Sequence, residues 1–384
     1  MKVVKHKTTQ RKTDSHMRQF GIASYGENNE YPEKVREIFE ASPTGKGCLN
    51  TAIRFIFGNG FTDPNLAQFV VDRKGTKGNQ LLQKGVEDYT YYQGFAFHVN
   101  YNALLEVSEV QAIPFEHCRI CINDDGMPDG RIAVYPDWTG RNKLIKKRPT
   151  KDLVKYYPAF NPDTNVLLTQ IGDQGIENYS GQVLYFSAEG HLTYPLSAYD
   201  PIMTEMSTEE GISTVLYRNA KHNFLPAGML IKKAQQSYTN DDDRERDTGD
   251  GDLVSEITNW QGDEKAAKMI LVEVGFDEEK PEFVEFPIKS FDKMFDSTSK
   301  YVQDNIGRMF MQPPILRGVD VGAGFGADLM KNAYDFYNSI VESDRKAIES
   351  TLEPLLRRMN GNFSTYNIQP LEYQKQATDE TLDQ

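Results

Sequence analysis

The sequence predicts an α+β fold, and three observations indicate it. Residues 94–200 contain short runs rich in Val, Ile, Tyr and Phe between turn sequences such as NPDTN, which is typical of strands. Residues 289–359 contain two long runs with apolar residues at helical spacing, joined by a glycine-rich stretch. A small α/β unit at 229–288 lies between the first of these helices, at 290–311, and an earlier predicted helix at 207–224. The chain of 384 residues has room for two or three domains.

The chain begins with a basic arm, residues 1–19, in which Asp14 is the one acidic residue. A charged arm of this kind is usually solvated. It can also contact a neighbouring subunit or a nucleic acid, and the sequence leaves both interpretations open.

Helices are predicted next at 32–40, 43–57 and 79–92. Ser42 is the expected N-cap of the second helix and Pro43 its first residue, because a serine side chain accepts from a free helix amide and proline lacks an amide proton. The sequence GNGF at 58–61 ends that helix. After Gly94 the chain turns into the strands.

The predicted helix at 207–224 opens with a capping box formed by Ser207 and Glu210. The inserted unit then contains a strand GMLIKK, an acidic stretch NDDDRERDTGDGD, a short helix near 252–260 and strands KMILVEV and EFVEFPI. These elements indicate a separate small module between two helices.

The helix that starts after residue 289 carries one apolar stripe, formed by Phe291, Met294, Phe295, Thr298, Val302, Ile306 and Met309. Pro313 and Pro314 end it, because proline cannot continue a helix. A glycine loop follows, and residues 329–359 are predicted to form one long continuous helix. The polar tail after Tyr373 is expected to be loose.

Composition limits the classes of function. The net charge of −13 argues against a general nucleic-acid-coating surface, although it is compatible with DNA that passes through a channel without being gripped. Three cysteines do not make a disulfide scaffold. The chain contains no apolar run of membrane-spanning length, and its N-terminus lacks the apolar core of a signal peptide, so we expect a soluble protein that is made inside the cell and has no membrane partner.

Three sequence motifs are candidates for metal, redox or phosphate chemistry. Cys118 and Cys121 lie in an alternating strand pattern without a second ligand pair, which favours structural cysteines over zinc or redox chemistry. The acidic stretch 241–252 lacks the glycine and the glutamate of a calcium loop and is interpreted as a solvated loop or a docking surface for a basic partner. The glycine loop 318–326 lacks the Lys-Ser/Thr of a phosphate-binding loop. We therefore expect no cofactor, no metal and no catalytic residue.

The order of these segments resembles the portal proteins of tailed bacteriophages. The resemblance covers roughly residues 30–360 and is carried by GNGF at 58–61, YYQGFAFHVNYN at 91–102, IPFEHCR at 113–119, NFLPAGML at 223–230 and SFDKMFDSTSKYVQDNIGRMFMQPPILRG at 290–318. It implies a portal-type architecture, with a wing at 20–200, a first stem helix at 201–226, a clip at 227–288, a second stem helix at 289–312, a tunnel loop at 313–328, a long helix across the wing at 329–359 and a short crown or tail at 360–384.

The resemblance also implies a function. Portal proteins form a structural, non-enzymatic ring of twelve identical subunits at one capsid vertex, through which double-stranded DNA is packaged and ejected. The implied partners are the terminase large subunit, a head–tail adaptor and the major capsid protein, and the implied location is the virion, with assembly in the host cytoplasm. The residues expected to line the DNA channel are Arg317, Gly318, Val319, Val321, Gly322, Gly324, Phe325, Gly326 and Lys331. Those expected to dock a partner at the clip are Asp241, Asp242, Asp243, Glu245 and Asp247.

Two alternatives remain from the sequence. The first is another virion assembly protein, such as a neck or baseplate subunit. The second is a nuclease in which carboxylates hold a metal ion.

Overall fold

The structure is a computed structural model that describes residues 15–141, 145, 148–175, 177–188, 193–222, 228–233, 269–274, 291–319 and 327–373. The chain divides into two compact units. Unit 1 comprises Met1–Ser207 and Gln303–Gln384, and unit 2 comprises Thr208–Val302. Unit 2 is therefore an insertion in the sequence of unit 1.

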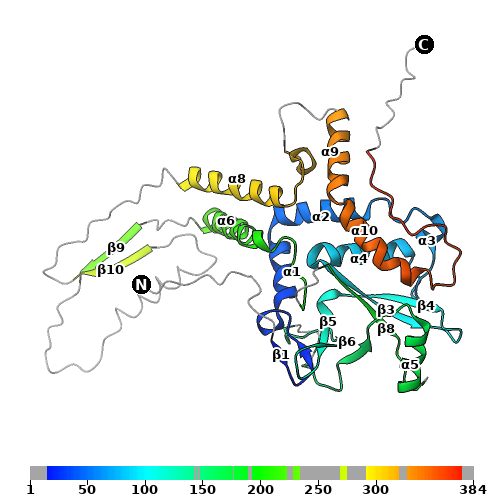
Figure 1. The fold of residues 1–384 in the computed structure, drawn as a ribbon. Coiled ribbons are helices and arrows are strands. Elements are labelled where there is room, and N and C mark those ends of the chain that lie inside the picture. The colour runs from blue at the N-terminus through cyan, green and yellow to red at the C-terminus, as the bar shows by residue number, and fades with distance from the viewer. Residues whose placement is uncertain are drawn as a thin grey trace, which may run out of the picture. The chain divides into compact units, whose positions relative to one another are not determined.

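The three helices predicted in the first part of unit 1 are present (Figure 1), as α1 Tyr31–Ala41, α2 Pro43–Phe57 and α4 Gly78–Tyr92. The structure adds two short helices that were not predicted, η1 Glu27–Asn29 and α3 Pro64–Gln68. The expected cap of α2 is confirmed, because the Ser42 side chain accepts a hydrogen bond from the amide of Gly45 and Pro43 is the first helical residue.

Two antiparallel sheets follow in unit 1. The three-stranded sheet has the order β4-β3-β8, with β3 Gly94–Tyr101 in the centre, β4 Val107–Ile113 and β8 Gln182–Ser187. The five-stranded sheet has the order β1-β2-β5-β6-β7 and is formed by His16–Met17, Ile22–Ala23, Cys118–Ile122, Pro128–Val134 and Lys155–Pro158. The short helix η2 Phe115–His117 precedes β5, and α5 Thr164–Gln174 interrupts a region that was expected to be mostly strand. Asp163 starts α5, because its carboxylate accepts from the amide of Asn165.

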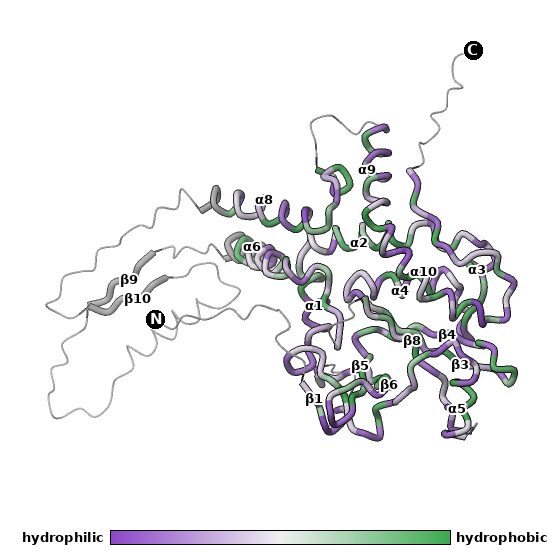
Figure 2. The backbone as a smooth tube through the Cα atoms, in the orientation of Figure 1, coloured by the Kyte–Doolittle hydropathy of each residue, from purple (hydrophilic) through white to green (hydrophobic). Residues whose placement is uncertain are grey.

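The main core of unit 1 lies where α4 packs on β3 and where α2 and α10 close over them (Figure 1). Figure 2 shows hydrophobic residues along these segments. Gly85 of α4 permits the close approach to the sheet, since a Cβ atom there would come 2.8 Å from the ring of Phe97. A second cluster, around Trp138 and Cys121, packs beneath the five-stranded sheet.

The helix predicted at 207–224 begins earlier than expected. The structure has η3 Asp200–Ile202 running directly into α6 Met203–His222, so Ser207 lies inside the helix and the predicted capping box is wrong. Pro201 at the start of η3 explains the difference, because proline fixes the backbone torsion that a helix start requires.

Unit 2 contains the later part of α6, the strands β9 Gly228–Lys233 and β10 Met269–Val274, and the first part of α8 Phe291–Met309. The two strands pair in parallel from Met269 opposite Gly228 to Val274 opposite Lys233. This confirms the predicted strands GMLIKK and KMILVEV. The predicted helix near 252–260 and the strand EFVEFPI lie outside the described residues.

The chain returns to unit 1 through the end of α8, the short helix η5 Pro314–Arg317, and the helices α9 Ala327–Ile340 and α10 Glu342–Leu356. The prediction of one continuous helix over 329–359 is wrong, because Val341, with φ −88° and ψ 4°, separates α9 from α10. Arg345 donates to the carbonyl of Asn338 at this junction, which satisfies an acceptor at the end of α9.

The segment 360–373, expected as the start of a short crown or tail, packs against the chain after α2. Gln369 exchanges backbone hydrogen bonds with residues 59 and 60, and Phe61 bridges to Ile368. The carboxylate of Asp63 accepts from both the amide and the hydroxyl of Ser364. This segment therefore belongs to the core of unit 1.

Candidate functional site

The turn that joins α8 to α9 is the candidate site, because the residues expected to face DNA lie in and around it. Of those residues, the structure describes Arg317, Gly318, Val319 and Lys331. The other expected channel and docking residues lie outside the described part of the chain; they are Val321, Gly322, Gly324, Phe325, Gly326, Asp241, Asp242, Asp243, Glu245 and Asp247.

Arg317 ends η5, and its guanidinium lies over the backbone of α8. A Cβ atom on Gly307 would come 1.9 Å from Arg317 Nη1, so the glycine leaves the space that the arginine fills. Arg317 Nη1 donates to the carbonyl of Gln303 at 3.4 Å. Arg317 is therefore held against α8 of its own chain, whereas Lys331 is exposed on α9.

Two buried side chains fix the start of the turn. Phe310 stacks on Tyr199, with ring centroids 3.9 Å apart and an interplanar angle of 18°. Gln312 Nε2 donates to the carbonyl of Cys48 at 2.6 Å and to the hydroxyl oxygen of Tyr337 at 3.0 Å. These contacts join the turn to α2 and α9. The chain therefore leaves α8 in a defined direction.

Gly318 and Val319 come directly after these anchored residues. Gly318 has φ +74°, a left-handed conformation that glycine adopts without steric cost. Among the described residues other than its two chain neighbours, no atom lies within 4 Å of the position of a Cβ atom there. Val319 is 46% exposed. The described part of unit 1 therefore does not pack tightly around these two residues.

The junction between α9 and α10 is built around Arg345, whose side chain is buried. Its Nη1 donates to the carbonyl of Phe55 at 2.9 Å and to Asn338 Oδ1 at 3.1 Å, and its Nη2 donates to the carbonyl of Asn338 at 2.9 Å. The guanidinium thus connects α2, the end of α9 and α10. Beside it lies an open cavity of about 420 Å³, lined in part by Asp335, Glu342, Lys346 and Glu349.

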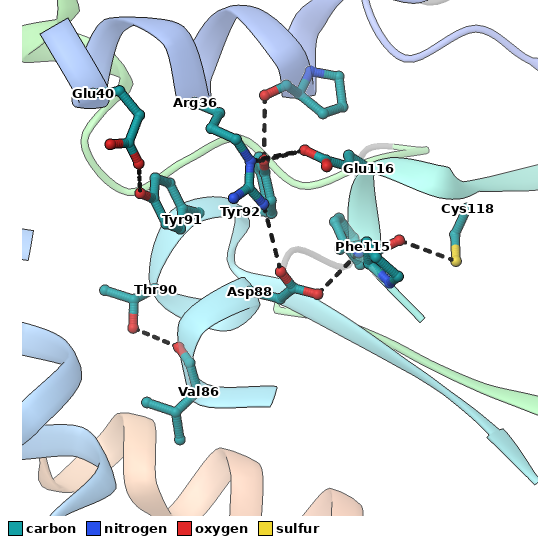
Figure 3. Close-up of polar contacts among 12 residues, drawn as sticks. Arg36, Glu40, Val86, Asp88, Thr90, Tyr91, Tyr92, Phe115, Glu116 and Cys118 are labelled. Atoms are coloured by element: carbon teal, nitrogen blue, oxygen red, sulfur yellow. Dashed lines mark hydrogen bonds and ion pairs between the residues drawn. The ribbon is translucent and has the colours of Figure 1, made fainter. Parts of the chain in front are cut away.

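A second polar network lies inside unit 1, between α1, α4 and the residues before β5 (Figure 3). Arg36 Nε donates to Glu116 Oε2 at 2.9 Å, and Arg36 Nη2 lies 4.0 Å from Asp88 Oδ1. Asp88 Oδ2 accepts from the amide of Phe115 at 2.9 Å, and burial raises the pKa of the Asp88 carboxyl to about 7. The Tyr92 hydroxyl donates to the same Glu116 oxygen at 3.1 Å.

The network extends along α1 through Glu40, whose carboxylate accepts from the Tyr91 hydroxyl (Figure 3). The same carboxylate also accepts from Lys46 Nζ at 2.6 Å. The hydrogen bond from Lys46 holds the pKa of Glu40 below its usual value. Every one of these groups has a partner within unit 1. The arrangement holds helices together, and it offers no free nucleophile–base pair.

The two cysteines of the Cys-x-x-Cys motif are buried and free of disulfides. Burial raises the pKa of the Cys118 thiol, whose Sγ lies 3.9 Å from the carbonyl of Pro114, and it raises the pKa of Cys121 to about 12. A thiol with a raised pKa is a poor nucleophile and a poor metal ligand at neutral pH.

The described residues lack both a metal-binding cluster and a membrane-spanning helix. No group of three or more His, Cys, Asp or Glu side chains is placed there to hold a metal ion. No helix of that part of the chain has both the length and the apolar character to cross a membrane.

Sequence reasoning missed Arg345 and Asp88, the two residues at the centres of the polar networks. A signal for Arg345 existed, because it falls in the stripe formed with Ile348, Leu352 and Leu355, where a charged residue is out of place. Asp88 had no such signal, since its pairing with Arg36 depends on the packing of α1 against α4.

No protein-family profile matches the chain, and no curated protein matches it. The chain is similar to several solved structures. One, described as the virion of a native gene transfer agent particle, is 12% identical, with a TM-score of 0.46 and coverage of 91% of this chain and 84% of the other. Another, described as the neck of the empty gene transfer agent particle computed with C6 symmetry, is 11% identical, with a TM-score of 0.47 and coverage of 85% and 82%.

A third similar structure is an HK97-family phage portal protein from Corynebacterium diphtheriae. It is 13% identical, with a TM-score of 0.41, and the match covers 83% of this chain and 89% of the other.

Proposed function

We propose that this protein is the portal subunit of a phage-like particle. It forms a closed ring of identical copies, twelve by family resemblance, at one vertex of a capsid. The ring is a structural conduit for double-stranded DNA during packaging and ejection, and it has no enzymatic activity of its own. Its place is the virion, after assembly in the host cytoplasm.

The observation that carries the proposal is the insertion of unit 2. Residues Thr208–Val302 form a compact unit whose entry is α6 and whose exit is α8, and both helices continue into unit 1. This order agrees with the stem–clip–stem arrangement that the motifs at 223–230 and 290–318 implied. An enzyme with a single active-site pocket does not require a module inserted between two long helices, whereas a portal subunit of the implied architecture does.

The turn after α8 supports the channel role. Phe310 and Gln312 fix the base of the turn, whereas none of the described residues packs closely on Gly318, and Val319 is half-exposed. A fixed base followed by loosely packed residues suits a segment that contacts moving DNA. Lys331, which is exposed, is the better candidate for a transient phosphate contact, because Arg317 is engaged with α8.

The net charge of the chain supports a channel that does not bind DNA tightly. The net charge of −13 per chain makes a ring of copies strongly acidic, and an acidic wall repels the DNA backbone. Val321, Gly322, Gly324, Phe325 and Gly326 are proposed to complete the channel segment without adding charge. The acidic residues at 241–247 are proposed to dock the terminase large subunit or the head–tail adaptor, and the wing to contact the major capsid protein.

Electron microscopy of the purified protein tests the proposal. The expected result is closed rings with a central hole of DNA width. A species that stays monomeric at all concentrations would refute it. Substituting Gly322, Gly324 and Gly326 by alanine then separates a portal from another neck or baseplate subunit. Portal rings should still assemble, and particles built with them should lose packaged DNA, whereas a subunit outside the DNA path should be unaffected.

A further inference from the structure

Helix α9 carries an apolar stripe that its own chain covers only in part. Tyr337 and Ala333 are buried against unit 1, whereas Leu329 is 37% exposed and Phe336 is 53% exposed. Leu329 and Phe336 are seven residues apart, so they lie two turns apart on the same edge of the helix. Hydrophobic and hydrophilic residues alternate along α9 (Figure 2), and its N-terminal end points away from α2 and α10 (Figure 1).

The uncovered edge of α9 has an acidic border. Asp328 and Asp335 are exposed and precede Leu329 and Phe336 by one residue each. On the helix each carboxylate lies about 100° around the axis from the apolar side chain that follows it, and the exposed Lys331 lies between the two carboxylates, so this border keeps a net negative charge. We call the two carboxylates and the two apolar side chains the α9 edge.

The end of α8 presents a second exposed apolar side chain with the opposite charge beside it. Met311 is 60% exposed and has φ +51°, and its amide donates to the carbonyl of Arg308. Arg308 is itself exposed. The end of α8 therefore combines an apolar contact with a cation, which complements the α9 edge.

We infer that the α9 edge of one copy of this chain packs against Met311 and Arg308 of the next copy. The two surfaces belong to the same chain and differ from each other, so the contact between copies is head-to-tail. In a closed ring of copies, every such surface is paired, whereas an open row leaves one surface exposed at each end. Charge complementarity selects this occupant, because Arg308 meets the carboxylates of Asp328 and Asp335. The inference rests on the proposed function and names the interface of its ring.

Cysteine cross-linking between singly substituted copies tests the contact. One preparation carries Met311→Cys and the other, with a mass tag, carries Phe336→Cys. Neither can form the bond within one copy. Cys48, Cys118 and Cys121 are buried, so the background of oxidation is low. A disulfide needs Cα atoms about 4.4–6.8 Å apart, so it reports close contact.

The expected result is a tagged–untagged dimer on oxidation of the mixed preparation. Matched controls pair Phe336→Cys with Leu104→Cys or Met127→Cys, because Leu104 and Met127 are 78% and 64% exposed and lie elsewhere in unit 1. These mixtures should yield no dimer above the level of random collision. Equal yields in the controls, or dimers of Met311→Cys copies alone, would overturn the inference.

A second pair of variants gives an independent readout. Phe336→Arg should abolish rings in the microscope, since it replaces the apolar side chain by a cation that faces Arg308, whereas Leu104→Arg should form rings like the wild type. Rings that survive Phe336→Arg and give no cross-link overturn the interface and leave the portal proposal intact. A wild-type chain that forms no ring at any concentration refutes the portal proposal itself.

Discussion

Arg345→Ala is expected to destabilise unit 1 severely, although the residue lies in no site of chemistry. The side chain is 5% exposed and donates three hydrogen bonds, to the carbonyls of Phe55 and Asn338 and to the side chain of Asn338. Alanine leaves these acceptors without a donor and leaves a void between α2 and α10. Each buried acceptor that loses a charged donor costs about 1–3 kcal/mol. Because Asn338 lines the open cavity, water can replace part of what its two acceptors lose, so the total loss should lie in the lower part of the summed range, at about 3–5 kcal/mol.

The adjacent residue provides a matched control. Lys346 has a side chain that is 69% exposed and pairs only with Glu342, one turn away. An exposed pair of this kind contributes little to stability, because water and salt screen it. Lys346→Ala should therefore be nearly neutral. Arg345→Lys keeps the charge but cannot reach all three acceptors, so its stability should fall between the two.

Equilibrium urea unfolding of the three variants, followed by circular dichroism and by amide hydrogen exchange in α2, α9 and α10, measures the difference. Exchange in α9 and α10 should accelerate most in Arg345→Ala, because this arginine holds the junction at Val341. If Arg345→Ala lost no more stability than Lys346→Ala, the guanidinium would not support the junction and the reasoning would be refuted.

Three further predictions concern other buried contacts. Burial raises the pKa of Asp88 to about 7, so the folded state holds a proton that the unfolded state releases near pH 4. The free energy of unfolding should therefore fall as the pH rises from 4 to 7. Urea titrations across this pH range measure the fall, and Asp88→Asn should remove it. Gly307→Ala should stabilise the protein by about 1 kcal/mol, through its helix propensity, only when Arg317 is also replaced by alanine. In the wild type the added Cβ atom would displace the Arg317 guanidinium. A double-mutant cycle in which the two changes in unfolding free energy simply add would contradict this. Asp63→Ala should release the segment after Met359, since Ser364 loses both its hydrogen bonds, and limited proteolysis should then cut there first.

Local patterns predicted much of the fold correctly. The cap of α2 is an example, because Ser42 and Pro43 act within three residues of each other. The strands β9 and β10 were equally clear from their runs of β-branched and apolar residues. The start of α6 was mispredicted for a related reason, since the capping pair Ser207 and Glu210 is also common inside helices, and Pro201 decided the start.

The break between α9 and α10 could not be predicted from periodicity. The apolar pattern runs through Val341 without interruption, and the decisive contact joins Arg345 to Phe55, which is 290 residues away in the sequence. The polar centre at Asp88 is similar, because Asp88 and its partners Arg36 and Phe115 come from three separate segments. Contacts of this range depend on how helices pack, which no local pattern encodes.

The sequence by itself determined the order of the helices and strands, the insertion of a small module between two long helices, and the resemblance to phage portal proteins. These properties follow from periodicity, proline and glycine positions and short motifs, all of which act locally. Only the tertiary structure decided the roles of the charged side chains. Arg317, expected to face DNA, packs on Gly307, and Arg345 supports a helix junction. Burial and long-range partners decide whether a charge binds a ligand or holds the fold, and both arise only when the chain is packed.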